Sequence, residues 1–181
     1  MSTSPRVVAV HRAPGHDFSK QPNESITLLA GLGVAGDAHM GAQVKHRSRV
    51  KADPTQPNLR QVHLIASELL DEVNEKGYSV QPGDLGENIT TAGIDLINQP
   101  VGTTLRIGDA VIGLTGLRNP CVQIGAFADG LQSEMLGRDD DGKLVRKTGV
   151  MAVVLRGADV TPGNEILVAL PAGDPIPMEK I

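Results

Sequence analysis

Short apolar segments bounded by glycine, proline and small polar residues recur along this chain of 181 residues. Segments of this kind are typical of β-strands, because alternating apolar side chains cover one face of a sheet. One segment, 67–77, instead has the helical spacing of apolar residues over several turns, with Ser67 predicted as its N-cap and Gly77 at its end. The pattern predicts a mainly β fold, a closed or folded sheet with helical insertions. The predicted strands are 6–11, 25–29, 61–65, 102–107, 109–117, 149–155 and 165–170.

Length, charge and composition restrict the class of protein. The chain is long enough for one domain, predicted over 1–170, and the proline-containing segment 171–181 is predicted to be a loose tail. The net charge of -4 and the aromatic content of 2% argue against nucleic acid as a partner. No apolar run approaches membrane length, and a single cysteine permits no internal disulfide. These features predict a cytoplasmic protein that binds neither nucleic acid nor a membrane.

The single cysteine, Cys121, lies just after the strand predicted over 109–117. Because proline does not continue a central strand, Asn119 is predicted as a helix N-cap and Pro120 as the first helical residue. Cys121 would then lie in the first turn of a short helix, where free backbone N–H groups and the neighbouring Arg118 favour the thiolate. The alternative is a small buried hydrophobe, which is the usual state of a free cysteine.

A glycine-rich sequence at 31–36 matches the pattern G-x-G-x-x-G. The nucleotide-binding form of this motif requires a following helix within a strand–helix–strand unit. Here a turn-like sequence, 37–41, and a polar basic segment follow instead. We therefore interpret 31–36 as a glycine-rich turn rather than a nucleotide site.

Two further regions have the composition of ligand-binding loops. The polar segment 42–60 is either a solvated loop or a mobile flap that meets an anionic ligand. The segment 81–93 is dense in glycine, which lets a backbone approach a ligand closely, and it holds the polar residues Asn88, Thr90 and Thr91. The basic residues of the first segment are Lys45, His46, Arg47, Arg49, Lys51 and Arg60.

Common catalytic motifs are missing from the sequence. It contains no G-x-S-x-G nucleophile elbow, no P-loop and no H-E-x-x-H zinc motif. No histidine pairs with Cys121 at zinc-binding spacing. The remaining features are one soft thiol and the glycine-rich and basic segments, and this combination favours an anionic cofactor that carries a soft metal or sulfur.

Several segments, in this order along the chain, resemble the MOSC domain, the C-terminal domain family of molybdenum cofactor sulfurases. The sequence looks like a small standalone member, and the resemblance spans roughly residues 30–170. The most specific segment is Arg118-Asn119-Pro120-Cys121. The resembling segments are 36–39, 60–65, 83–91, 105–109, 118–121 and 149–152.

The resemblance implies a MOSC-like β-barrel that binds the pterin-based molybdenum cofactor (Mo-molybdopterin). It implies that Cys121 is the family's cysteine, which either ligates molybdenum or carries a persulfide sulfur. Cations near this cysteine would bind the cofactor phosphate. The resulting candidates for cofactor-binding residues are His39, Lys45, Arg47, Arg60, Asn88, Thr90 and Arg118.

Three functional hypotheses follow. The first is a molybdenum-cofactor-binding oxidoreductase that reduces N-hydroxylated bases or related small molecules, with Cys121 as catalytic residue and metal ligand. The sequence shows neither the pyridoxal-phosphate-binding module of full sulfurases nor the extra N-terminal domain of larger reductases, so a separate electron-donor protein would be needed. The second hypothesis is a sulfur-carrier or cofactor-delivery protein with a persulfide on Cys121. The third is a binding module that retains the fold without the chemistry.

Overall fold

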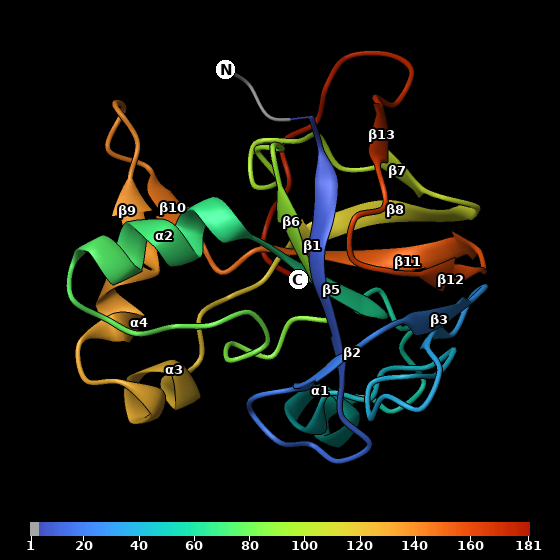
Figure 1. Ribbon diagram of the computed structural model, residues 1–181, viewed down its shortest axis with the longest axis horizontal. Helices are drawn as coiled ribbons and strands as arrows, with labels where there is room; N and C mark the ends of the chain where they lie inside the picture. The colour runs from blue at the N-terminus through green and yellow to red at the C-terminus, as the bar shows by residue number, and fades with distance from the viewer. Residues whose placement is uncertain (1–3) are drawn as a thin grey trace.

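The computed structural model describes residues 4–181 and consists mainly of β-strands, as predicted (Figure 1). Eight strands form one sheet in the order β13-β7-β8-β11-β5-β6-β1-β2. β5 and β6 pair in parallel, and the other neighbours in this sheet pair antiparallel. The strands are β1 (Arg6–Arg12), β2 (Gln21–Asn23), β5 (Val62–Ala66), β6 (Ile89–Ala92), β7 (Thr104–Ile107), β8 (Ala110–Leu117), β11 (Val150–Arg156) and β13 (Ile166–Ala169).

Two smaller sheets contain the other strands of the described chain. β12 (Asp159–Val160), β3 (Ile26–Leu29) and β4 (Gly33–Val34) form a three-stranded sheet in that order, and β9 (Leu136–Arg138) pairs with β10 (Leu144–Arg146). The glycine-rich sequence 31–36 forms turns around β4, and the next helix does not begin until Arg47.

The eight-stranded sheet curves so that β13, at one edge, comes close to the start of β1, near the other edge. Arg6, at the start of β1, forms an isolated antiparallel bridge with Glu165, which directly precedes β13. The N–H of Val7 donates to the carbonyl of Asn164 over 2.9 Å. The N–H of Ile166 also donates to the carbonyl of Pro5 over 2.9 Å. Within residues 4–181, β1 and β13 share this one bridge and no continuous ladder, so the fold is mainly β as predicted but the sheet does not form a closed barrel.

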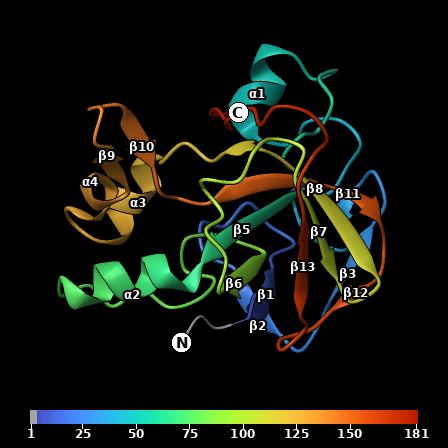
Figure 2. The same ribbon diagram turned by 90° about the horizontal axis from the view of Figure 1, so that it is seen from above.

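Four helices are present in the described chain, and three of them lie together with the β9–β10 hairpin on one side of the sheet (Figures 1 and 2). None of them is long and apolar enough to cross a membrane. The sequence predicts the longest, α2, but it does not predict α1, which buries no residue and so has no apolar periodicity. The helices are α1 (Arg47–Ala52), α2 (Ser67–Glu75), α3 (Val122–Phe127) and α4 (Leu131–Glu134).

The start of α2 differs from the prediction by one residue. Its N-cap is Ala66, and Ser67 is the first helical residue without a side-chain capping bond. β5 runs directly into α2, so the last strand residue already has the extended backbone that an N-cap requires. The predicted N-cap at Ser67 is therefore wrong because the connection between strand and helix contains no loop.

The protein has two hydrophobic cores. The first, which we call the sheet core, lies within the curved sheet and includes alternate residues of β7 and β8, among them Leu105, Ile112 and Leu114. The second, which we call the helical core, joins Leu70 of α2 to Ile124 of α3. The segment between β8 and α3 connects the two cores, and it contains Cys121.

The C-terminal segment, for which the sequence predicts a loose tail, makes main-chain hydrogen bonds with the sheet. The N–H of Leu117 donates to the carbonyl of Glu179 over 2.8 Å, and the N–H of Ile181 donates to the carbonyl of Leu117 over 3.2 Å. Met178 is buried in the sheet core. The segment therefore lies against the end of β8 that leads to Cys121.

We expect alanine at Gly149 to destabilise the fold. Gly149 has a φ of +84°, and an added Cβ would meet the carbonyl of Leu64 and, at 2.8 Å, the side chain of Ile65. Backbone strain and overpacking together predict a loss of about 2–6 kcal/mol in the free energy of unfolding. Gly163→Ala is the matched control, because Gly163 also has a positive φ but faces open space, so only about 1 kcal/mol is expected. Urea denaturation of both variants measures the difference, and equal losses would contradict the expectation.

Candidate functional site

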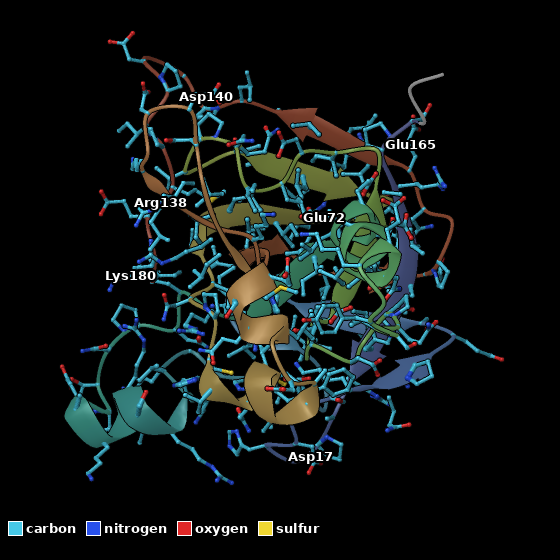
Figure 3. All side chains as sticks on the ribbon, turned by 90° about the vertical axis from the view of Figure 1, so that its left-hand side faces the viewer. Asp17, Glu72, Arg138, Asp140, Glu165 and Lys180 are labelled. Carbon is cyan, nitrogen blue, oxygen red and sulfur yellow. The ribbon has the colours of Figure 1, made fainter. Side chains whose placement is uncertain are left out.

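A cavity of about 390 Å³ opens where six segments meet at the end of the molecule that carries α1. Figure 3 views this region from the helical side and shows Asp17, one of its lining residues, at the same end as α1. The cavity contains the thiol, several cations and four histidines. Its lining residues are His16, Asp17, Phe18, Lys20, His39, His46, Arg47, Ser48, Arg60, His63, Gly86, Asn88, Arg118, Asn119, Cys121, Gln123 and Met151.

Cys121 is the N-cap of α3, and its half-buried side chain packs against the helical core. Its Sγ lies 3.9 Å from Nη2 of Arg118 and 3.8 Å from Oε1 of Gln123. The prediction that Cys121 lies inside the first helical turn, after an Asn119 N-cap, is wrong because the helix begins at Val122. The thiol nevertheless lies at the start of a helix and beside an arginine, as the sequence predicts.

A tertiary contact explains why the helix starts late. The N–H of Arg118 donates to the carbonyl of Gly149 over 3.0 Å, and Oγ1 of Thr148 donates to the carbonyl of Arg118 over 2.9 Å. These bonds keep Arg118 paired to the chain that enters β11. The extended conformation therefore continues past the end of β8, which a local sequence pattern does not reveal.

The guanidinium of Arg118 lies beside the thiol of Cys121. Its Nη1 donates to the carbonyl of Leu85 over 2.8 Å, which fixes the orientation of Nη2 toward Cys121. Burial lowers the pKa of Arg118, and the nearby Cys121 opposes this shift. Because arginine is the most basic side chain, Arg118 stays cationic beside the sulfur.

Arg60 places a second cation on the cavity. Its Nη1 donates to the carbonyl of Ile181 over 2.9 Å. Burial, followed by repulsion from Arg49 and Arg118, lowers the pKa of Arg60 to about 10, which still leaves it protonated at neutral pH. Two arginines and a thiol that face one cavity favour an anionic ligand.

A buried ion pair between Lys20 and Asp37 supports the cavity wall. The Nζ of Lys20 lies 2.8 Å from Oδ2 of Asp37, and these side chains are only 4% and 1% exposed. Burial lowers the pKa of Lys20, although the attraction of Asp37 opposes that effect. His39 donates its N–H to Oδ1 of Asp37 over 3.0 Å and places ring Nδ1 at 3.3 Å from the same oxygen. No local pattern marks Lys20 in the sequence, since its partner lies in a separate segment.

Six of the eight residues predicted for the site line the cavity: Cys121, Arg118, Arg60, Arg47, His39 and Asn88. Asn88 has a supporting position, because its Nδ2 donates to Asp37 and to the carbonyl of His11 while its Oδ1 accepts from the N–H of His63. Lys45 is exposed to solvent and does not line the cavity. Thr90 is buried, and its hydroxyl donates to Glu87 over 2.9 Å, away from the cavity.

Three further histidines, His16, His46 and His63, line the cavity, and the sequence does not mark them as site residues. Burial lowers the pKa of His63 well below its usual value, so its ring is neutral, and Nε2 lies 2.8 Å from the carbonyl oxygen of Thr148. Burial and the neighbouring Arg60 lower the pKa of His46 to about 4. The ring of His16 packs edge-on against His39 at a centroid distance of 5.3 Å. Within residues 4–181, no cluster of three histidine, cysteine or acidic side chains could hold a metal ion by itself.

Solved structures with the same fold include three bacterial proteins. YuaD from Bacillus subtilis aligns with a TM-score of 0.76 at 23% identity, over 92% of this chain and 96% of its own. YiiM from Geobacillus stearothermophilus gives a TM-score of 0.63 at 17% identity, over 91% of this chain and 75% of its own. YiiM from Escherichia coli gives 0.60 at 20% identity, over 94% of this chain and 73% of its own. These low identities show a shared fold alone.

A comparison with curated protein sequences finds no match. The family profile described as the MOSC domain matches residues 37–167, which is more than half of the chain. The matched region starts at Asp37 and contains His39, Arg60, Arg118 and Cys121. It confirms the resemblance noted from the sequence, and the chain belongs to the MOSC domain family.

Proposed function

We propose that this MOSC domain binds the pterin-based molybdenum cofactor in the cavity, with Cys121 as the metal ligand, and acts as an oxidoreductase. The observation that supports the proposal is the position of the single thiol in a cavity that also contains Arg118, Arg60 and Arg47. A thiolate is a soft ligand of the kind that binds molybdenum well, and arginines suit an anionic pterin phosphate.

The residues present fit this cofactor by the chemistry of their donor groups. Cys121 would hold the metal, while Arg60 and Arg47 would hold the phosphate. Arg118 lies 3.9 Å from the sulfur and would place a positive charge beside the ligated thiol. When bound, the cofactor would supply a centre that exchanges an oxygen atom and two electrons with a small molecule. A volume of about 390 Å³ falls within the usual range of ligand pockets.

We further propose that the substrates are N-hydroxylated bases or related small molecules. This substrate class follows from the family resemblance of the sequence, and the electropositive cavity is compatible with a polar substrate beside an anionic cofactor. Electrons would arrive from a separate donor protein.

A second candidate function is sulfur transfer or cofactor delivery. The observation that favours it is the accessibility of Cys121, which is half-buried, lines the cavity and has polar contacts to its sulfur at 3.8 and 3.9 Å. A sulfur with this exposure has room for a second sulfur atom as a persulfide. In that case the same arginines would stabilise the persulfide anion, and no substrate would be reduced.

Elemental analysis of protein from a host that makes the cofactor separates the two functions. The reductase proposal expects about one molybdenum and one pterin per chain, together with reduction of an N-hydroxylated base when an electron donor is added. Cyanide-labile sulfur in protein that contains no molybdenum would instead support the second function. Protein with neither molybdenum nor labile sulfur would contradict both.

One arginine variant and one lysine variant, both in α1, test the proposed contact with the cofactor phosphate. Arg47 lines the cavity, whereas Lys51 lies on the same helix outside the lining set, and both are exposed. We expect Arg47→Gln to weaken cofactor retention about threefold to tenfold, as for the loss of one charge-assisted hydrogen bond. Lys51→Gln should retain the cofactor like the wild type. Equal retention in both variants would remove Arg47 from the site.

A further inference from the structure

We infer that His39 is the proton donor of this cavity and that Asp37 positions it for that role. The inference rests on the proposed reductase function, because it names the residue that would protonate the departing oxygen. The structural basis is the pair formed by Asp37 and His39 at the cavity wall.

Asp37 is held in place by donors from four separate parts of the chain. Its Oδ2 accepts hydrogen bonds from Asn88 Nδ2 at 3.0 Å and from the N–H of Ala13 at 3.2 Å, and it lies 2.8 Å from Lys20 Nζ. Its Oδ1 faces His39. A carboxylate with this many donors cannot rotate without breaking several bonds, so it presents Oδ1 to the histidine as a fixed acceptor.

The ionised carboxylate of Asp37 determines which ring nitrogen of His39 keeps its proton. Burial alone would raise the pKa of Asp37, but the hydrogen bonds from His39 and the charge of Lys20 outweigh it and hold that pKa well below its usual range. An ionised Oδ1 can only accept a hydrogen bond, so the Nδ1 of His39 must carry a proton. The exchangeable proton of the ring is therefore the one on Nε2.

The ring of His39 is accessible from the cavity while its orientation is restricted. Its side chain is 30% exposed, and His16 packs edge-on against it. A general acid needs this combination of a fixed orientation and contact with the reacting molecule. The charged and titratable groups that share its surroundings are His16, Lys20, Asp37, His46, Arg47 and Arg60.

The other histidines on the cavity are less suited to proton transfer. Nε2 of His63 is engaged with the carbonyl of Thr148, and the ring is held neutral by burial. Nδ1 of His46 lies 2.9 Å from the hydroxyl of Ser48, which does not stay ionised as a carboxylate does. His39 is the one cavity histidine within the described residues that is paired with a carboxylate.

The proton would be consumed when the N–O bond of an N-hydroxylated base breaks. The substrate accepts two electrons and two protons, an N–H bond forms, and the oxygen leaves as water. The electrons would come from a reduced flavin or iron–sulfur protein. His39 would donate one proton from Nε2 to the departing oxygen and recover it from solvent, the second proton would come from solvent, and Asp37 would hold the ring in place through Nδ1.

The first test measures the ring tautomer in protein without cofactor. Nitrogen-15 NMR at a pH where His39 is neutral should show the proton on Nδ1. In the double variant Lys20→Met, Asp37→Leu, which leaves no buried charge unpaired, the proton should move toward Nε2, the tautomer that a free imidazole side chain prefers. A proton on Nε2 in the wild type would overturn the Asp–His pair.

The second test measures turnover of cofactor-loaded protein. His39→Gln should lower kcat by about 10²–10⁴-fold and leave KM within about threefold, with molybdenum content unchanged. Added imidazole should partly restore His39→Gly and leave the wild type unaffected. An undiminished kcat in His39→Gln would overturn the inference. A wild type without molybdenum or reductase activity would instead overturn the proposed reductase function, and with it the transfer of the proton to the substrate oxygen. The NMR measurement of the His39 tautomer would then still test whether Asp37 positions His39.

Discussion

Replacing Cys121 by alanine is expected to remove molybdenum from the purified protein, with a loss of more than about tenfold in metal content. Cys121 carries the one thiol of the chain, and it lies beside Arg118 in the cavity. Reductase activity should fall in parallel with metal content. Cys121→Ser should also fail, because a hydroxyl oxygen is a harder and more weakly acidic ligand than a thiol. Elemental analysis after purification under identical conditions gives the comparison.

The neighbouring Val122→Ala variant is the matched control. Val122 is 78% exposed and does not belong to the cavity lining, so its truncation should leave molybdenum content unchanged. The thermal midpoint of Cys121→Ala should stay close to that of wild type, since a small change at a half-buried position costs about 1 kcal/mol or less. Full molybdenum content in a folded Cys121→Ala protein would refute the metal-ligand role.

Asp37→Leu is expected to destabilise the protein by about 3–5 kcal/mol, because it leaves the buried Lys20 ammonium without its counter-ion. Asp71→Leu on the exposed face of α2 is the control and should change stability by about 0.5 kcal/mol or less. The double variant Lys20→Met, Asp37→Leu should recover part of the loss, since both buried charges are then absent. Urea denaturation at neutral pH measures all three variants, and a double variant less stable than Asp37→Leu would contradict the ion-pair explanation.

The same carboxylate predicts a pH dependence. The folded protein holds the pKa of Asp37 below that of the unfolded chain, which is about 3.9. The unfolded state therefore binds more protons as the pH falls, so this stabilisation is complete well above pH 4 and is lost progressively below it. The gap in stability between wild type and Asp37→Leu should be narrower at about pH 3 than at pH 7. A gap that widens in acid would show that Asp37 does not act through its negative charge.

Local sequence patterns predict seven strands of the described chain, because apolar alternation is a direct consequence of a half-buried sheet. They do not predict β2, β4, β6, β9, β10 and β12, which have only two to four residues each. They predict α2 for the same reason, since Leu69, Leu70 and Val73 form one buried face. They do not reveal α1, a fully solvated helix with no apolar face to record. They also do not predict the contact between β1 and β13, because it joins opposite ends of the chain.

The cavity shows the same division between local and long-range information. The segment from Arg118 to Cys121 was recognisable because its residue types are contiguous. The exact start of α3 was not, because it depends on pairing with Gly149. Lys45 and Thr90 are close in sequence to lining residues but lie elsewhere, since backbone direction decides which neighbour faces the cavity. The role of Lys20 depends on Asp37, which only the folded chain brings near.

The position of Cys121 between the two hydrophobic cores has a mechanical consequence. Its side chain packs against the helical core, whereas Arg60 lies two residues before Val62, the first residue of β5 and a member of the sheet core. A ligand bound by both residues would clamp the helices to the sheet and suppress their independent opening. Amide hydrogen exchange in α3 and α4 would then slow on cofactor loading as much as in β5, so the helices would report occupancy from outside the cavity.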